Sequence, residues 1–193
     1  MNYQLSKENL LDTTSDCLCL PLFKDGTLCS EGQKVDAQLS KSISSLREQF
    51  KISGDAGKTI LLPLNNDKAQ RILFLGLGEA DKLTKIAFRK AAKALASTIK
   101  DSNIQSLSLD LTKVELTGNQ NSQTDTASEI VLAIEESNYA FDQFKSKKAT
   151  ASSLENLTFH STSADIEASI KKAKALSAGM SFTKDLGNMP GNV

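Results

Sequence analysis

The apolar positions of this chain repeat with two different periods, and each period predicts a different kind of element. Short apolar or alternating runs of about four to eight residues are typical of β-strands, whereas apolar residues three or four positions apart are typical of amphipathic helices. The short runs predict strands at residues 3–6, 16–22, 58–64, 71–75, 104–111 and 154–161. The longer period predicts helices at residues 35–50, 85–100, 127–141 and 165–186.

Local signals set several boundaries of these elements. Proline has no backbone N–H to give to a sheet, so we expect Pro21 to end the second strand. Thr84 is a good N-cap for the helix that starts at Lys85. One continuous helix is predicted at 35–50, because its apolar stripe advances in steps of three and four. The stripe consists of Val35, Leu39, Ile43, Leu46 and Phe50.

The order of these elements predicts the fold class. Strands and helices interleave as β, β, α, β, β, α, β, α, β, α, which favours a three-layer α/β domain with a mixed, partly parallel sheet and helices on both faces. The short polar link at 65–68 predicts that the strands beside it are neighbours or a hairpin. Alternation of Leu107, Leu109 and Leu111 with polar residues predicts a half-buried strand. Residues 112–125 are expected to form a loop, and 144–153 a loop or hairpin.

Composition excludes several classes of partner. The 23 basic and 23 acidic side chains give a formal net charge of zero, so bulk charge recruits neither nucleic acid nor a membrane surface. No apolar run approaches a membrane span, and the first residues lack the pattern of a signal peptide, so we expect a cytoplasmic protein. The spacing of Cys17, Cys19 and Cys29 fits buried hydrophobic side chains in a reducing compartment better than a zinc site.

The C-terminal segment carries the most specific signal. At residues 184–193 a helical run breaks into Asn-Met-Pro-Gly-Asn, so we expect a cut chain, with a domain at 1–186 and the start of a linker at 187–193. The segment resembles the interdomain junction of the M17 leucyl aminopeptidases, also called cytosol aminopeptidases. The matching residues are Lys184, Asp185, Leu186, Asn188, Pro190 and Asn192. We expect Asp185, Asn188 and Asn192 to fix the turn through hydrogen bonds.

A second segment resembles the N-terminal domain of the same family. Residues 71–78 read as a strand that ends in Gly-Leu-Gly, followed by Leu83-Thr84 and a basic helix at 88–92. Periodicity alone does not separate a macrodomain-like fold from a flavodoxin-like one. The resemblance implies the macrodomain-like fold of that N-terminal domain. The first 64 residues contain no motif that we match to the family.

The resemblance also implies a function for the complete protein. Members of the family release N-terminal amino acids from peptides with two divalent metals, zinc or manganese, which activate a water and polarise the scissile carbonyl. Their catalytic and metal-binding residues lie in a C-terminal domain beyond the junction, so none is expected in this segment, which alone should be inactive. The family forms homohexamers, in which the N-terminal domain assists assembly and shapes access to the active sites. The partners implied are therefore its own catalytic domain and other copies of the chain.

A binding module is the first alternative function. Gly76 and Gly78 follow a strand and precede a helix, which is where phosphates bind in nucleotide folds, and macrodomains bind ADP-ribose. Position 81 is Asp where the dinucleotide fingerprint has its third glycine, and no P-loop motif is present. Glycines that allow a tight turn explain the motif more simply than a vestigial ligand cleft.

DNA binding and an independent hydrolase are further alternatives. Basic residues that could meet phosphates lie at Lys82, Lys85, Arg89, Lys90, Lys93, Lys145, Lys147 and Lys148. Without net positive charge or interleaved aromatic residues, we expect these to be solvated faces. His160 is the only histidine, and no Gly-x-Ser-x-Gly motif accompanies it, so we expect a structural or surface role rather than a catalytic one.

Overall fold

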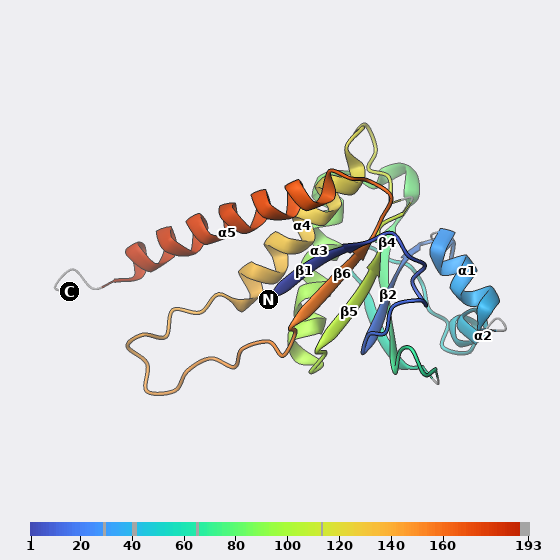
Figure 1. Ribbon diagram of the computed structural model, residues 1–193, viewed down its shortest axis with the longest axis horizontal. Coiled ribbons are helices and arrows are strands. Elements are labelled where there is room, and N and C mark those ends of the chain that lie inside the picture. Colours follow the sequence, from blue (N-terminus) through green and yellow to red (C-terminus); the bar gives the residue numbers. More distant parts are fainter. Residues whose placement is uncertain (29, 40–41, 65, 113, 190–193) are drawn as a thin grey trace.

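The computed structural model describes residues 1–28, 30–39, 42–64, 66–112 and 114–189 of the chain. In these residues six strands form one sheet, with helices packed against it (Figure 1). The elements are, in chain order, β1 (Asn2–Ser6), β2 (Cys17–Phe23), α1 (Ser30–Gln38), α2 (Ser42–Gln49), β3 (Thr59–Pro63), β4 (Arg71–Gly78), a 3-10 turn η1 (Ala80–Lys82), α3 (Lys85–Asp101), β5 (Ser106–Asp110), α4 (Ser122–Asn138), β6 (Asn156–His160) and α5 (Ile166–Asn188).

The sheet is mixed and mostly parallel, as the element order predicted. Its strand order is β1-β6-β5-β2-β4-β3. All neighbours run parallel except β3 and β4, which form the antiparallel pair predicted from the short link between them. The carboxyl ends of five strands therefore meet at one edge of the sheet, which is where α/β folds place ligands.

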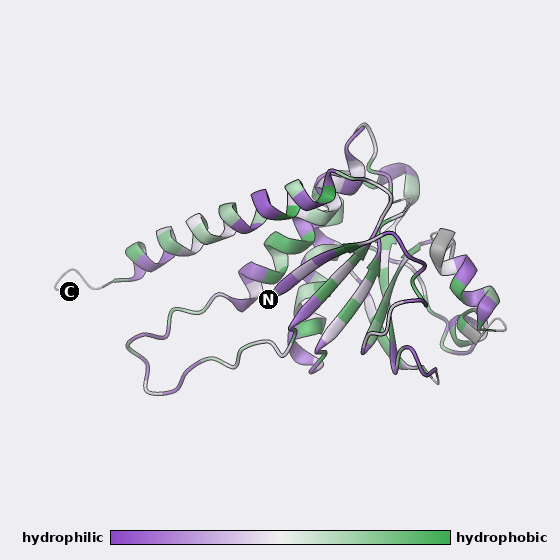
Figure 2. Cartoon of the chain, in the orientation of Figure 1, coloured by the Kyte–Doolittle hydropathy of each residue, from purple (hydrophilic) through white to green (hydrophobic). Residues whose placement is uncertain are grey.

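Two hydrophobic cores cover the two faces of the sheet and confirm the three-layer arrangement. One core packs α1 and α2 against one face, through residues such as Leu20, Val35 and Ile43. The larger core packs α3, α4 and α5 against the other face, with Phe88 and Phe159 near its centre. Figure 2 shows hydrophobic residues recurring along the strands and the inner faces of these helices. Within the described residues, no helix combines the length and apolarity needed to cross a membrane.

Pro21 lies inside β2 rather than at its end, so the boundary predicted from it is wrong. The strand continues to Phe23, and Pro21 still pairs with Leu75 of β4. On its other side β2 pairs with β5 only as far as Cys19. Pro21 therefore sits where one edge of the strand has already lost its neighbour, and its missing N–H interrupts no pairing there.

The helix predicted at 35–50 is two helices. The helix α1 ends at Gln38 and α2 begins at Ser42. Residues 40–41 lie outside the described part of the chain, and Asp36 of α1 supplies a local cause for the separate start of α2. The Asp36 carboxylate accepts a hydrogen bond of 3.0 Å from the backbone N–H of Ser44, in the first turn of α2, and a second one from the Ser44 hydroxyl. A carboxylate that caps a helix from another segment gives that helix its own start. Phe50, the last member of the predicted stripe, is exposed.

The strand β5 is buried on both faces, although its alternating pattern predicted a half-buried strand. Ser108 and Asp110, on the polar side of the pattern, are as inaccessible as the leucines. Helices cover both faces of a largely parallel sheet, so polar side chains in it need local partners. Asp110 accepts a hydrogen bond of 2.7 Å from the backbone N–H of Thr112. The following helix, α4, also begins earlier than predicted, within the expected loop 112–125.

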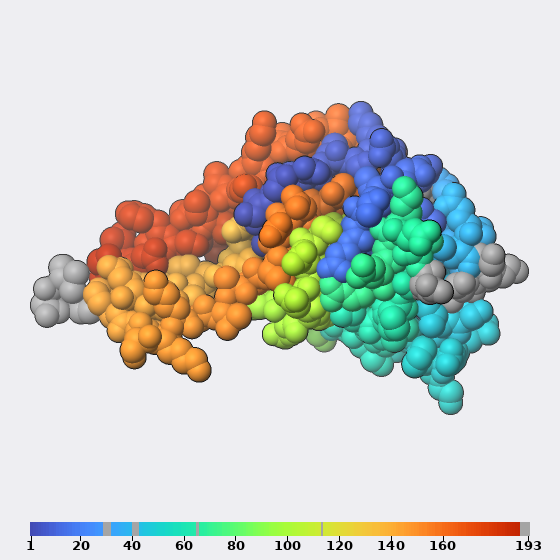
Figure 3. Space-filling view, turned by 60° about the horizontal axis from the view of Figure 1, so that its bottom comes forward, coloured from blue at the N-terminus to red at the C-terminus, as the bar shows by residue number. Residues whose placement is uncertain are grey.

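Two segments project from the same end of the domain. The distal half of α5 extends beyond the sheet, and the loop at residues 139–155 extends on the same side (Figure 1). Figure 3 shows both segments at the same end of the molecule from a different direction. A connection of this length without secondary structure is uncommon in a compact domain and is usually functional.

Candidate functional site: the exit of the terminal helix

The glycines of the Gly-Leu-Gly motif allow the backbone of residues 54–58 to pass close to the end of β4. The N–H groups of Gly76 and Gly78 donate to the carbonyl oxygens of Lys58 and Gly54, at 2.8 and 2.7 Å. A Cβ atom added at Gly76 would overlap the carbonyl oxygen of Asp55, and Gly78 has a φ of +83°. Both amides that could face a phosphate are therefore engaged within the protein, and both positions need glycine for the fold.

The connections that follow β4 and β5 place apolar residues in the larger core. Leu83, Val114 and Leu116 follow β4 and β5, and all three belong to the larger core. The two connections are tied together by Thr117, whose N–H donates to the carbonyl oxygen of Leu83 at 2.8 Å. Its hydroxyl donates to the carbonyl oxygen of Asp81 at 3.0 Å. The connections that follow β4 and β5 are thus packed into the core and joined to each other.

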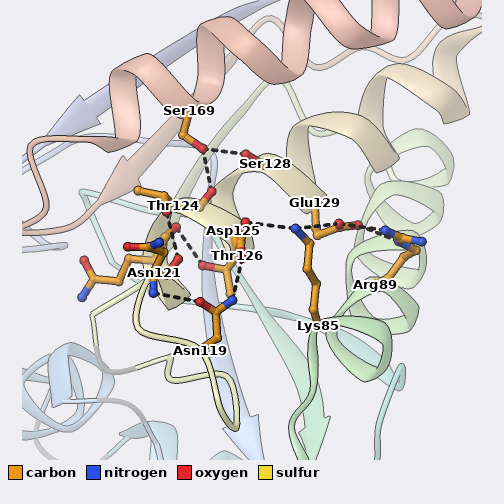
Figure 4. Close-up of polar contacts among 11 residues, drawn as sticks. Lys85, Arg89, Asn119, Asn121, Thr124, Asp125, Thr126, Ser128, Glu129 and Ser169 are labelled. Carbon is orange, nitrogen blue, oxygen red and sulfur yellow. Dashed lines mark hydrogen bonds and ion pairs between the residues drawn. The ribbon is translucent and has the colours of Figure 1, made fainter.

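Most of the basic face of α3 is paired with acids of α4 (Figure 4). Arg89 binds the carboxylate of Glu129 through two nitrogens, at 2.7 and 2.9 Å, and the pairing raises the pKa of the Arg89 guanidinium. Lys85 reaches Asp125 at 3.0 Å. Burial works to raise the pKa of Asp125, but hydrogen bonds from Asn119 and Lys85 outweigh it and lower the pKa.

The same pairing extends along the helix. Lys93 faces Glu136 of α4 at 3.4 Å. Outside the helix, Lys82 of η1 pairs with the nearby Glu79. Of the predicted basic residues, Lys145, Lys147 and Lys148 are exposed in the loop 139–155. The face of α3 therefore holds α3 against α4, and its positive charge is largely compensated within the domain.

His160 and the cysteines are structural. The His160 ring is buried and lies 3.0 Å from the carbonyl oxygen of Glu8 and 3.1 Å from the hydroxyl of Thr13, so it joins β6 to the segment after β1. The Cys17 and Cys19 side chains are buried, as predicted, and burial raises the pKa of Cys17 to about 12. Cys29 lies outside the described residues. No set of three or more His, Cys, Asp or Glu in the part of the chain described is arranged to hold a metal ion.

The predicted junction residues come together around Tyr139, at the C-cap of α4. The Tyr139 hydroxyl donates a hydrogen bond of 2.8 Å to the carboxylate of Asp185, and the side-chain amide of Asn188 donates to that hydroxyl at 3.4 Å. The ammonium group of Lys184 lies over the Tyr139 ring, 5.0 Å from its centroid. Lys184 also approaches Glu136 at 4.0 Å. Three residues of the junction thus tie the distal part of α5 to the end of α4.

This cluster has one member that the sequence did not reveal. Tyr139 lies 45 or more residues before its partners, and nothing in its local sequence distinguishes it. Burial and the hydrogen bond to Asp185 raise the pKa of Tyr139. Asn188 binds Tyr139, and α5 continues through Gly187 to Asn188, with Met189 as its C-cap. Leu186 is exposed, and Pro190 and Asn192 lie outside the described residues.

The chain is similar to known proteins over its whole length. Residues 19–148 match the model of the cytosol aminopeptidase family, N-terminal domain. A cytosol aminopeptidase of Haemophilus influenzae is 30% identical over 100% of this chain and 39% of its own length. A probable cytosol aminopeptidase of Stutzerimonas stutzeri is 35% identical over 91% of this chain and 36% of its own. The chain thus spans about two fifths of the curated relatives that it matches.

Solved structures share the fold. A mutant of tomato leucine aminopeptidase superposes with a TM-score of 0.74 at 21% identity, over 100% of this chain and 39% of that one. The bottromycin maturation enzyme BotP superposes with a TM-score of 0.65 at 18% identity, over 92% of this chain and 33% of that one. In both cases the likeness covers a minor part of a longer protein.

Proposed function

Because this chain belongs to the cytosol aminopeptidase family, as its N-terminal domain, we propose that it is the non-catalytic part of an aminopeptidase that releases N-terminal residues from peptides. The observation that carries the proposal is the full-length similarity to relatives of which the chain spans only 39%. The remaining part of such a protein has room for a complete catalytic domain. The chemistry is assigned to that part.

The metal chemistry belongs to the catalytic part as well. Two divalent ions, zinc or manganese, would activate a water and polarise the scissile carbonyl there. The described residues of this chain do not fit such a site, because no group of three or more potential ligands is brought together. We therefore assign no catalytic or metal-binding residue to the chain and expect it to be inactive by itself.

The helix α5 would connect this domain to the catalytic one. In this proposal residues 1–186 are the domain and residues 187–193 begin the connection. Lys184, Asp185 and Asn188 support that role, since each contacts Tyr139 and thereby fixes the direction in which the helix leaves the domain. Leu186 would face the catalytic part, and Pro190 and Asn192 would shape the turn beyond the helix.

At the level of the assembly, the domain would help a cytoplasmic homohexamer to form and would shape access of peptides to its active sites. The binding-module alternative has less support. The amides of Gly76 and Gly78 are engaged in the fold, and most of the basic face of α3 is paired. ADP-ribose should therefore leave the melting temperature of the chain unchanged, and DNA should not retard it on a gel at low salt.

The intact polypeptide tests the proposal. It should hydrolyse leucyl-p-nitroanilide when manganese is supplied, lose that activity when the metal is chelated, and recover it when manganese is returned. A hexamer in sedimentation analysis would support the assembly role. An intact polypeptide without metal-dependent aminopeptidase activity would contradict the proposal.

A further inference from the structure

The helix α5 carries two apolar stripes, although a helix at the surface of a domain needs only one. The inner stripe, formed by Ile166, Ile170, Ala173 and Ser177, is buried against the domain. A second set of residues recurs in steps of four, three, four and three, the 3.5-residue period of a helix that packs along another helix. We call this set the outer seam; it consists of Ala175, Gly179, Phe182, Leu186 and Met189.

The outer seam faces away from the domain. Its large side chains are among the most exposed apolar residues of the described chain, with Phe182 at 64% and Leu186 at 58% exposure. A Cβ atom added at Gly179 would meet no atom within 4 Å. Figure 2 shows hydrophobic residues recurring along this projecting half of α5. Contiguous apolar surface of this kind marks an interaction site.

The chemistry of the outer seam suits an apolar helical partner. Between Ala175 and Met189 the only charged side chains are Lys184 and Asp185, and both contact Tyr139 on the inner side of the helix. The small residues Ala175 and Gly179 allow a close backbone approach, and the larger ones follow toward the end of the chain. Nucleic acid and anionic lipid would both require positive charge on this face.

We propose that the outer seam is the docking surface for a helix of the catalytic part of the same polypeptide. The inference rests on the proposed function, in which the catalytic part follows α5. A part that is joined to the end of α5 is held at a high effective concentration beside the seam. Tyr139 contributes by fixing the orientation in which α5 presents the seam. The N-terminal domain would thus be positioned by packing along α5 and not only by the covalent link.

Hydroxyl-radical footprinting of the intact, unmutated polypeptide tests whether the seam is covered. Phe50, which follows α2 on the other face of the sheet, is 52% exposed and serves as a reference of the same residue type. Ile86, at 80% exposure, is a second reference. From this domain alone, Phe182 should be oxidised at least as fast as Phe50. If a partner excludes water from the seam, we expect the oxidation rate of Phe182 to fall about fivefold or more below that of Phe50. Oxidation of Phe182 at or above the Phe50 rate would overturn the proposal.

A photoactivatable cross-linking side chain at position 186 identifies the occupant, with the same group at position 86 as the control. The expected product has the mass of one chain and joins position 186 to a peptide beyond residue 193, whereas position 86 gives no such product. A product with the mass of two chains would show that a second copy covers the seam and would overturn the proposal. Aminopeptidase activity measured on the same preparation separates the two claims. An active protein with an exposed seam contradicts only this inference, whereas an inactive protein contradicts the proposed function.

Discussion

At the scale of single residues, Tyr139 contacts the distal part of α5 at several points. It is the shared partner of Lys184, Asp185 and Asn188. Replacing Tyr139 with Phe keeps the ring beneath Lys184 and removes the hydroxyl. We expect a small loss in the free energy of unfolding and faster amide hydrogen exchange at residues 184–189.

A matched control for this prediction is Tyr3→Phe. The Tyr3 hydroxyl also donates to a carboxylate, that of Glu135, at 2.9 Å. Its loss should cost a similar free energy and leave exchange in the distal part of α5 unchanged. Equal exchange at residues 184–189 in the Tyr139→Phe variant and the wild type would show that Tyr139 does not hold the helix.

Gly76 gives a second prediction at this scale. A methyl group at Gly76 would collide with backbone, which cannot move aside cheaply, so Gly76→Ala should lower the free energy of unfolding by at least about 2 kcal/mol. Gly179→Ala is the contrasting variant, because it fills open space inside a helix and should raise the stability of residues 1–193 by about 0.5–1 kcal/mol. Urea titrations measure both. Equal stability of the Gly76→Ala variant and the wild type would contradict the close approach of residues 54–58.

Gly76 and Tyr139 also show what local sequence can and cannot predict. A Gly-x-Gly after a strand indicates tight backbone geometry, but which segment makes the close approach depends on a distant loop. The tail motif singled out Lys184, Asp185 and Asn188, and the structure brings all three together. Tyr139 could not be predicted, since its role depends only on where α4 ends relative to α5.

At the scale of elements, the contact between α3 and α4 depends on one strongly buried carboxylate. The Glu129 side chain is 4% exposed and is held by Arg89. Arg89→Ala leaves that carboxylate with only the more distant Lys85, so it should cost about 1–3 kcal/mol in unfolding free energy. Lys93→Ala removes an exposed pair with Glu136 and should cost less than about 0.5 kcal/mol. Similar, small losses for both variants would contradict the assigned importance of Glu129.

The same contact predicts a dependence on pH. The pKa of Asp125 in the folded chain lies below its ordinary value of 3.8, so its stabilising effect is present above that value and is lost as the pH falls through the folded pKa. The stability difference between wild type and Asp125→Asn should therefore be largest near neutral pH and shrink below about pH 4. A difference that stays constant between about pH 3 and about pH 6 would contradict this assignment.

Periodicity predicted the order and kind of the elements because each follows from local patterns of apolar residues. It failed where a distant partner decides the outcome. Pro21 is tolerated in β2 because the pairing of β2 with β5 stops at Cys19, Asp36 starts a new helix by capping it, and Asp110 is buried although the alternating pattern placed it on the exposed side of the strand. The macrodomain-like detail came from the family resemblance rather than from periodicity.

At the scale of the whole molecule, the chain is an α/β domain in which Leu83, Val114 and Leu116, after β4 and β5, belong to the larger core. The projecting half of α5 and the loop 139–155 extend from this domain as two further surfaces (Figure 1). Both lie at the end of the molecule where α5 ends, which suits a domain that attaches to a partner.

Aminopeptidase activity of purified residues 1–193, compared with the intact polypeptide at equal molar concentration and with manganese present, tests the central claim most directly. The account predicts hydrolysis of leucyl-p-nitroanilide by the intact polypeptide and none above background by residues 1–193. Metal-dependent hydrolysis by residues 1–193 alone would place the chemistry within this domain and contradict the account.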